Sequence, residues 1–133
     1  MGTVVVDSSL VIAFLTPDDA LHRSAVHAIG SVRETGDDFI LPASVLAEVL
    51  VHPYRISAVV GDSSGRAITE FFGSPRSLDQ EVAIASARLR AGHRSLRLPD
   101  ALVVATGMVD RATTLTFDQR LAGVDGSVRV LAP

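Results

Sequence analysis

Apolar residues along the chain alternate between short branched runs and longer segments with helical spacing. The branched runs, which are typical of buried strands, cover residues 3–6, 39–41, 113–115 and 127–131. The segments between them place apolar residues every three or four positions, as a helix packed on one side requires. Two parallel strands need a long crossover connection, which is usually a helix. The pattern therefore predicts an α/β domain with a mainly parallel sheet.

Capping and breaking residues set the limits of the predicted helices, which span about residues 8–15, 18–36, 42–52, 79–91 and 99–110. Ser8 or Ser9 is expected to cap the first helix, and Pro53 should stop the third. Between residues 54 and 72 we expect two short helices, because Gly61 and Gly65 lie in the middle of this segment.

Three aspartates occupy the same kind of position in this pattern. Asp7 and Asp118 come just after predicted strands, and Asp100 lies in the first turn of a helix. In open parallel sheets, the carboxyl ends of strands and the amino ends of the following helices line one crevice. Each aspartate alone is equally well explained as a helix cap or a partner of the helix dipole. Together, the three predict a convergent acidic site.

Glu48 is the only charged residue in the apolar segment LPASVLAEVLV. If this helix is buried, the carboxylate needs a cation, a proton or hydrogen bonds to compensate its loss of water. The alternative is a solvent-facing stripe that Glu48 shares with Ser44 and His52, four residues away on either side. We expect the buried arrangement, which would add Glu48 to the acidic site.

Carboxylates that gather without basic partners repel one another, and a divalent cation bound by oxygen atoms relieves this repulsion. Mg²⁺ or Mn²⁺ is the natural candidate. Such an ion binds phosphate and activates water, which is the chemistry of phosphodiester hydrolysis. Because the cation inverts the local potential, a chain with a net charge of -3 can still hold a nucleic acid at this site.

Length and composition limit the remaining possibilities. The 133 residues suit a single domain over residues 1–133, and no apolar run is long enough for a membrane span. The chain has no cysteine and no signal-peptide pattern, so we expect a cytoplasmic protein. All twelve basic residues are arginine. The lack of lysine argues against phosphoacceptor signalling domains and haloacid-dehalogenase-like phosphatases, which both use one.

Four segments resemble the PIN-domain nucleases and, among them, the VapC-type toxins of prokaryotic toxin-antitoxin pairs. The segments are VVVDSSLVIAFL, LPASVLAEVLVHP, LRLPDALVVATG and LTFDQRL, in the family's order and at roughly its spacing. The resemblance covers essentially the whole chain and implies a three-layer α/β/α sandwich. The implied catalytic and metal-binding residues are Asp7, Glu48, Asp100 and Asp118. Asp7 and Asp100 are the surest ligands for Mg²⁺ or Mn²⁺, and Thr116 and Ser8 are expected to line the pocket.

The same resemblance implies an endoribonuclease that leaves a 5′ phosphate on its RNA product. Such proteins are usually homodimers, and a VapB-type antitoxin inhibits them by placing its tail in the active-site groove. The alternative is a catalytically inactive PIN-like domain that serves as an interaction module. Retention of all four acids argues against it, because a carboxylate cluster without metal lowers stability and should be lost when it has no function.

The densest basic segment precedes Asp100 and contains Arg88, Arg90, Arg94 and Arg97. These side chains could contact RNA phosphates beside the acidic site, and a solvated helix end explains them equally well. The four histidines lack the i, i+4 spacing of a helical metal pair, so we expect structural or exposed roles for them.

Overall fold

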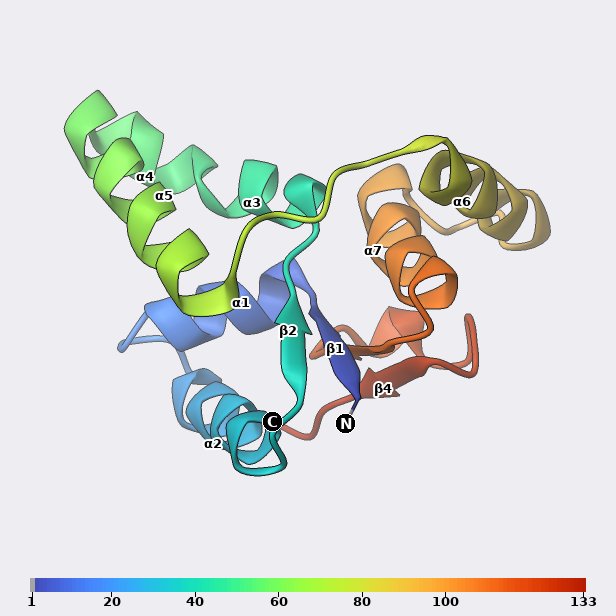
Figure 1. Cartoon of the computed structure of the whole chain (residues 1–133), viewed down its shortest axis with the longest axis horizontal. Coiled ribbons are helices and arrows are strands. Elements are labelled where there is room, and N and C mark those ends of the chain that lie inside the picture. The colour runs from blue at the N-terminus through green and yellow to red at the C-terminus, as the bar shows by residue number, and fades with distance from the viewer. Residues whose placement is uncertain (1) are drawn as a thin grey trace.

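The strands form one parallel sheet at the centre of the computed structural model, which describes residues 2–133 (Figure 1). The strands are β1 (Thr3–Val6), β2 (Asp38–Ile40), β3 (Thr113–Thr116) and β4 (Val128–Val130). They lie in the order β2-β1-β3-β4, and every neighbouring pair is parallel. The prediction of a mainly parallel sheet is confirmed for the part of the chain that the structure describes.

Helices cover both faces of this sheet. Val4 of β1 lies on the face of the sheet that α2 (His22–Glu34) covers. Thr114 of β3 lies on the opposite face of the sheet, next to Gly107 of α7 (Leu98–Val109). Helix α1 (Ser8–Leu15) packs against α2, and α6 (Gln80–Gly92) packs on α7. This arrangement confirms the three-layer α/β/α fold. Its main core joins the buried strand β1 to α1, α2 and Val103 of α7.

The middle of the chain departs from the sequence prediction. Helix α3 (Ala43–Val49) ends before Pro53, and Pro53 lies in the first turn of α4 (Val51–Ile56), where its missing N–H needs no helical partner. The predicted break around Gly61 is wrong, because α5 (Ala58–Phe72) is continuous. A Cβ atom at Gly61 would overlap the ring of Tyr54. This glycine therefore allows α4 and α5 to pack closely and does not end a helix.

Two predicted helix starts also need correction. The N-cap of α1 is Asp7, whose side chain accepts a hydrogen bond from the backbone N–H of Ser8, so neither Ser8 nor Ser9 is the cap. Helix α2 starts at His22 and not near residue 18. Asp19 instead accepts a hydrogen bond from the N–H of Leu21 at 2.8 Å and stabilises a turn. Among residues 2–133, no helix is long and apolar enough to cross a membrane.

Arg76 connects the segment before α6 to the end of α7. Its guanidinium forms a two-point ion pair with Asp110, with both N–O distances at 2.9 Å, and contacts Asp79 at 2.9 Å. The backbone of Arg76 bonds to Leu41 O and Ala43 N. Because the arginine side chain is only 22% exposed, this pair is partly shielded from water.

We expect Arg76→Ala to lower the free energy of unfolding by about 2 kcal/mol, because Asp110 is left partly buried without its partner. Urea denaturation of the purified variant measures this change. Arg129→Ala is the matched control, since Arg129 is an exposed arginine on β4 and its loss should have little effect. Equal unfolding midpoints for the two variants would contradict the assigned role of Arg76.

Candidate active site

The acidic residues gather around the carboxyl ends of the two central strands. Asp7 follows β1, and Asp118 lies two residues beyond β3, which is the neighbour of β1. The chain passes from β1 to β2 on one side, while β3 lies on the other side, so the topology switches between β1 and β3. A crevice for ligands forms at such a switch point in parallel sheets. The N–H of Asp7 donates to Leu115 O at 3.1 Å and fixes the two strand ends together.

Asp7 is a buried carboxylate held by uncharged donors. Its side chain accepts hydrogen bonds from the Ser8 N–H at 2.8 Å, the Ser9 hydroxyl at 3.1 Å and the Thr116 hydroxyl at 2.6 Å. The residue is only 4% exposed. Burial raises the pKa of Asp7 above its ordinary value, the nearby charge of Asp100 adds to this, and the three hydrogen bonds oppose it. Within residues 2–133, no ion pair compensates this carboxylate.

Hydrogen bonds of the Ser9 and Thr116 hydroxyl groups connect the start of α1 to the end of β3. The Ser9 hydroxyl accepts from Phe117 N–H at 3.1 Å, and the Thr116 hydroxyl accepts from Asp118 N–H at 2.9 Å. Thr116 therefore contacts Asp7 through its side chain, whereas Ser8 contributes its backbone N–H to Asp7. From the sequence, Ser8 and Ser9 are both interpreted as helix caps that also contact the water shell of a metal, and no local motif distinguishes the role of Ser9 from that of Ser8.

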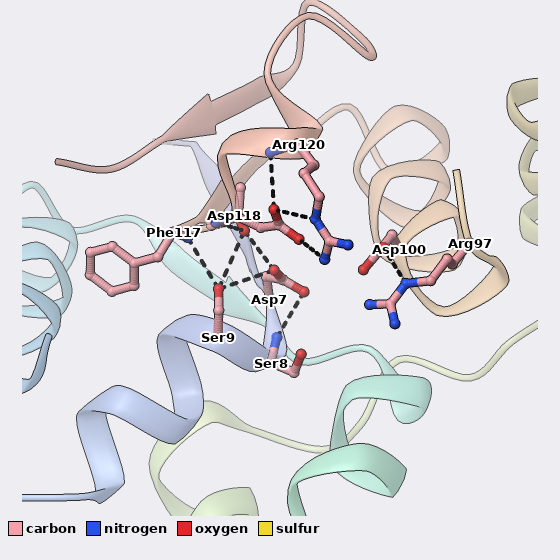
Figure 2. Close-up of polar contacts among 9 residues, drawn as sticks. Asp7, Ser8, Ser9, Arg97, Asp100, Phe117, Asp118 and Arg120 are labelled. Carbon is pink, nitrogen blue, oxygen red and sulfur yellow. Dashed lines mark hydrogen bonds and ion pairs between the residues drawn. The ribbon is translucent and has the colours of Figure 1, made fainter. Parts of the chain in front are cut away.

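Two of the acidic side chains face arginines (Figure 2). Asp118 accepts hydrogen bonds from Nε and Nη2 of Arg120, at 3.0 and 2.7 Å, and from the Arg120 backbone N–H at 2.9 Å. This pairing lowers the pKa of Asp118. Asp100 contacts Arg97 through a single longer pair of 3.4 Å between Nε and Oδ2. The Asp118 pair is therefore the tighter of the two.

Glu48 occupies α3 beside these residues, but the structure corrects its expected burial. The residue is exposed, and so is His52, as the solvent-facing alternative required. Partial loss of water still raises the pKa of Glu48, and the charges of Asp7 and Asp100 raise it further. Glu48 is therefore close enough to sense both aspartates, although it is not a buried carboxylate.

The basic segment reaches the site only through Arg97. Arg90 donates from Nε to Leu96 O at 3.2 Å, which stabilises the turn before α7, and Arg88 lines a hollow between α6 and the end of α7. Arg94 is exposed. The sequence interpretation missed Arg120, whose position two residues after Asp118 was the available signal, because a short Asp-x-Arg spacing allows a local ion pair.

A hollow of about 320 Å³ opens beside the acidic cluster. Asp100 and Arg120 contribute to its lining together with Leu96, Leu121 and Val124. A larger hollow of about 700 Å³ lies between α2, β4 and the last residues, and none of the four acids lines it. The smaller hollow therefore borders the acidic site through Asp100, which is the one of the four acids that lines it.

The acidic side chains offer oxygen donor atoms, which a hard divalent cation prefers, but in this structure they are not arranged as a metal cage. Among residues 2–133, no group of three or more acidic or histidine side chains is arranged to hold a metal ion. Asp100 and Asp118 instead form ion pairs with Arg97 and Arg120 (Figure 2). Asp7 nevertheless supplies a buried, uncompensated carboxylate, and Asp100 and Glu48 are electrostatically coupled to it. Oxygen ligands of this kind suit Mg²⁺ or Mn²⁺.

Solved structures with the same fold include toxin-antitoxin complexes and a toxin. A toxin-antitoxin complex from Klebsiella pneumoniae has a TM-score of 0.78 at 20% sequence identity, over 96% of each chain. VapBC2 from Rickettsia felis, bound to a promoter DNA fragment, has a TM-score of 0.75 at 11% identity, also over 96% of each chain. VapC20 from Mycobacterium tuberculosis, described as a Sarcin-Ricin loop cleaving toxin, has a TM-score of 0.73 at 19% identity, over 90% of this chain and 95% of that one.

The sequence itself gives the family assignment. No curated protein sequence matches the chain. The PIN domain family matches residues 4–127, a range that begins in β1, ends just before β4 and contains all four acidic positions. Because this match spans nearly the whole chain and the structure has the α/β/α fold with the acids at its switch point, the chain belongs to the PIN domain family.

Proposed function

We propose that this PIN domain is a metal-dependent endoribonuclease that acts as the toxin of a toxin-antitoxin pair. The observation that carries the proposal is the buried Asp7 carboxylate, which lies at the switch point without a cationic partner among the described residues. A nearby Asp100 and Glu48 make the local charge more negative. A divalent cation would remove this repulsion, and hydrolysis of phosphodiester bonds is the chemistry that such an ion supports.

In this proposal Asp7, Asp100 and Glu48 hold Mg²⁺ or Mn²⁺, which when bound supplies a Lewis acid and an activated water molecule. Ser9 and Thr116 keep the Asp7 carboxylate in one orientation through their hydroxyl groups. Arg97 must leave Asp100 for the ion to bind there. Its single 3.4 Å contact and its 63% exposed side chain make that release inexpensive.

The partner in this proposal is a VapB-type antitoxin, and the toxin is a homodimer. The support is the fold shared with proteins from toxin-antitoxin complexes and an apolar surface on α4 and α5. Val51, Ile56 and Val59 are 46%, 61% and 77% exposed there, and these two helices extend away from the sheet (Figure 1). Exposed apolar groups of this kind are common in surfaces that bind other proteins.

The test is cleavage of total cellular RNA by the purified protein in Mn²⁺ and in chelator. We expect cutting in Mn²⁺ only, with a loss of at least about 100-fold in Asp100→Asn, because this variant lacks a carboxylate that would hold the ion that stabilises charge at the reacting phosphate. Asp18→Asn is the matched control, because Asp18 is an exposed aspartate in the loop after α1. A folded protein that gains thermal stability from Mn²⁺ but cuts no RNA would instead favour the catalytically inactive interaction module.

A further inference from the structure

Arg120 is bound to Asp118 along only one edge of its guanidinium. The group has five N–H bonds, and the bonds from Nε and Nη2 to the Asp118 carboxylate use two of them. Among residues 2–133, Nη1 has no hydrogen-bond acceptor. The carboxylate therefore fixes the plane of the guanidinium and leaves the opposite edge available to a ligand.

This free edge is accessible and borders the acidic site. The Arg120 side chain is 68% exposed, whereas the Asp118 side chain behind it is only 19% exposed. Arg120 lines the hollow of about 320 Å³ together with Asp100. Figure 2 shows the guanidinium between Asp118 and Asp100, on the side of the site toward Arg97. A ligand that reaches Asp100 through this hollow therefore passes Arg120.

Asp118 is the least available metal ligand among the four acids. Coordination by Asp118 would break a two-point, charge-assisted pair, which is among the stronger polar interactions in proteins. Asp100 would lose only its single 3.4 Å contact with Arg97. Asp7 and Glu48 have no ion pair to lose within residues 2–133. Metal coordination would therefore break a strong ion pair at Asp118 but not at the other three acids.

We propose that Arg120 binds a phosphate group of the RNA backbone next to the cleaved bond, and that Asp118 positions Arg120 for this contact and is not a metal ligand. This inference rests on the proposed nuclease function. The flat, always charged guanidinium matches the oxygen atoms of a phosphate. It also places a positive charge at the edge of an acidic pocket, where a polyanion would otherwise be repelled.

RNA binding is the first test. Fluorescence anisotropy of a fluorescein-labelled, random-sequence single-stranded RNA is measured in chelator over a series of KCl concentrations. We expect Arg120→Gln to weaken binding about 10-fold and to lower the slope of log K against log salt by about 0.7, the value for one lost phosphate contact on a single strand. Arg129→Gln removes the same charge from β4, outside the hollow, and should change neither quantity.

Single-turnover cleavage of RNA in Mn²⁺ compares Arg120→Gln with Arg129→Gln when the ion is present. Arg120→Gln should raise the protein concentration that gives the half-maximal rate about 10-fold. Arg120→Lys should keep the salt slope, because it keeps the charge, but should cleave more slowly, because lysine cannot form the two-point pair with Asp118. If Arg120→Gln matches Arg129→Gln in both assays, the phosphate contact is overturned.

Metal binding tests the role of Asp118. We expect Asp118→Asn to keep the rise in melting temperature that Mn²⁺ gives the wild-type protein, whereas Asp100→Asn should lose it. Asparagine can still accept the backbone N–H of Arg120, so the local turn is kept. Equal losses in the two variants would overturn the positioning role. Failure of the proposed function is distinguishable from both results, because the wild-type protein itself would then cut no RNA.

Discussion

Replacing Asp7 with asparagine should abolish RNA cleavage and leave the metal-free protein at least as stable as the wild type. The variant loses the charge that the proposed metal needs, but it also loses the repulsion by Asp100 and the unfavourable burial of a carboxylate. Asparagine can keep the hydrogen bond from Ser8 N–H, and Thr116 can accept from its amide. Cleavage assays in Mn²⁺ and thermal unfolding in chelator measure the two effects.

The raised pKa of Asp7 also predicts how the stability of the metal-free protein depends on pH. Asp7 titrates near 3.8 in the unfolded chain and higher in the folded protein, so the folded state binds this proton more tightly. The stabilisation that this tighter proton binding gives the folded state is fully present below pH 3.8. It is lost as the pH rises through the folded pKa of Asp7. This loss should be missing in metal-free Asp7→Asn.

Asp7→Ala separates charge from hydrogen bonding, because it removes the cap of α1 as well. It should be less stable than Asp7→Asn by about 1 to 2 kcal/mol. If Asp7→Asn were destabilised as much as Asp7→Ala in chelator, or if it still cleaved RNA at the wild-type rate, the electrostatic account of the site would be wrong.

Gly107→Ala should destabilise the protein by about 3 kcal/mol through a collision between α7 and β3. A Cβ atom at residue 107 would overlap the Thr114 hydroxyl and lie 3.1 Å from Ala112 O. Thr114 is fully buried, so neither element can move away without disturbing the core. Since α7 also carries Asp100, we expect the variant to lose part of its affinity for Mn²⁺. Urea denaturation and Mn²⁺ titration measure these changes.

Thr114→Ala provides the control for this collision. The Thr114 hydroxyl is buried without a hydrogen-bond partner among the described residues, so its removal alone should change stability little. Combined with Gly107→Ala, it should restore more than half of the lost stability, because the overlapping oxygen is gone. Additive effects of the two substitutions would show that the collision is not the cause.

The positions of the site residues along the chain could be predicted from local patterns. Branched apolar runs located β1 and β3, and a parallel sheet brings the ends of such strands to one edge, so Asp7 and Asp118 were placed near each other without coordinates. Pro99 likewise placed Asp100 at the start of α7. These inferences depend only on periodicity and on the geometry of parallel strands.

Local patterns failed where packing between helices decided the outcome. Gly61 was expected to interrupt a helix, but the ring of Tyr54 packs against it and α5 continues. Glu48 was expected to be buried because its neighbours are apolar, yet its side of α3 faces solvent near the aspartates. In both cases local sequence does not specify which side of a helix faces the rest of the protein, because that depends on packing against residues far along the chain.

The sequence by itself determined the α/β class, the parallel sheet and the place of the acidic residues at the strand and helix ends, because these follow from short-range periodicity. Only the tertiary structure decided which groups compensate each acid: hydroxyls for Asp7, a weak pair with Arg97 for Asp100 and a two-point pair with Arg120 for Asp118. The physical reason is that the strength of an ion pair or hydrogen bond depends on distances of a few ångströms and on burial, which side-chain packing sets.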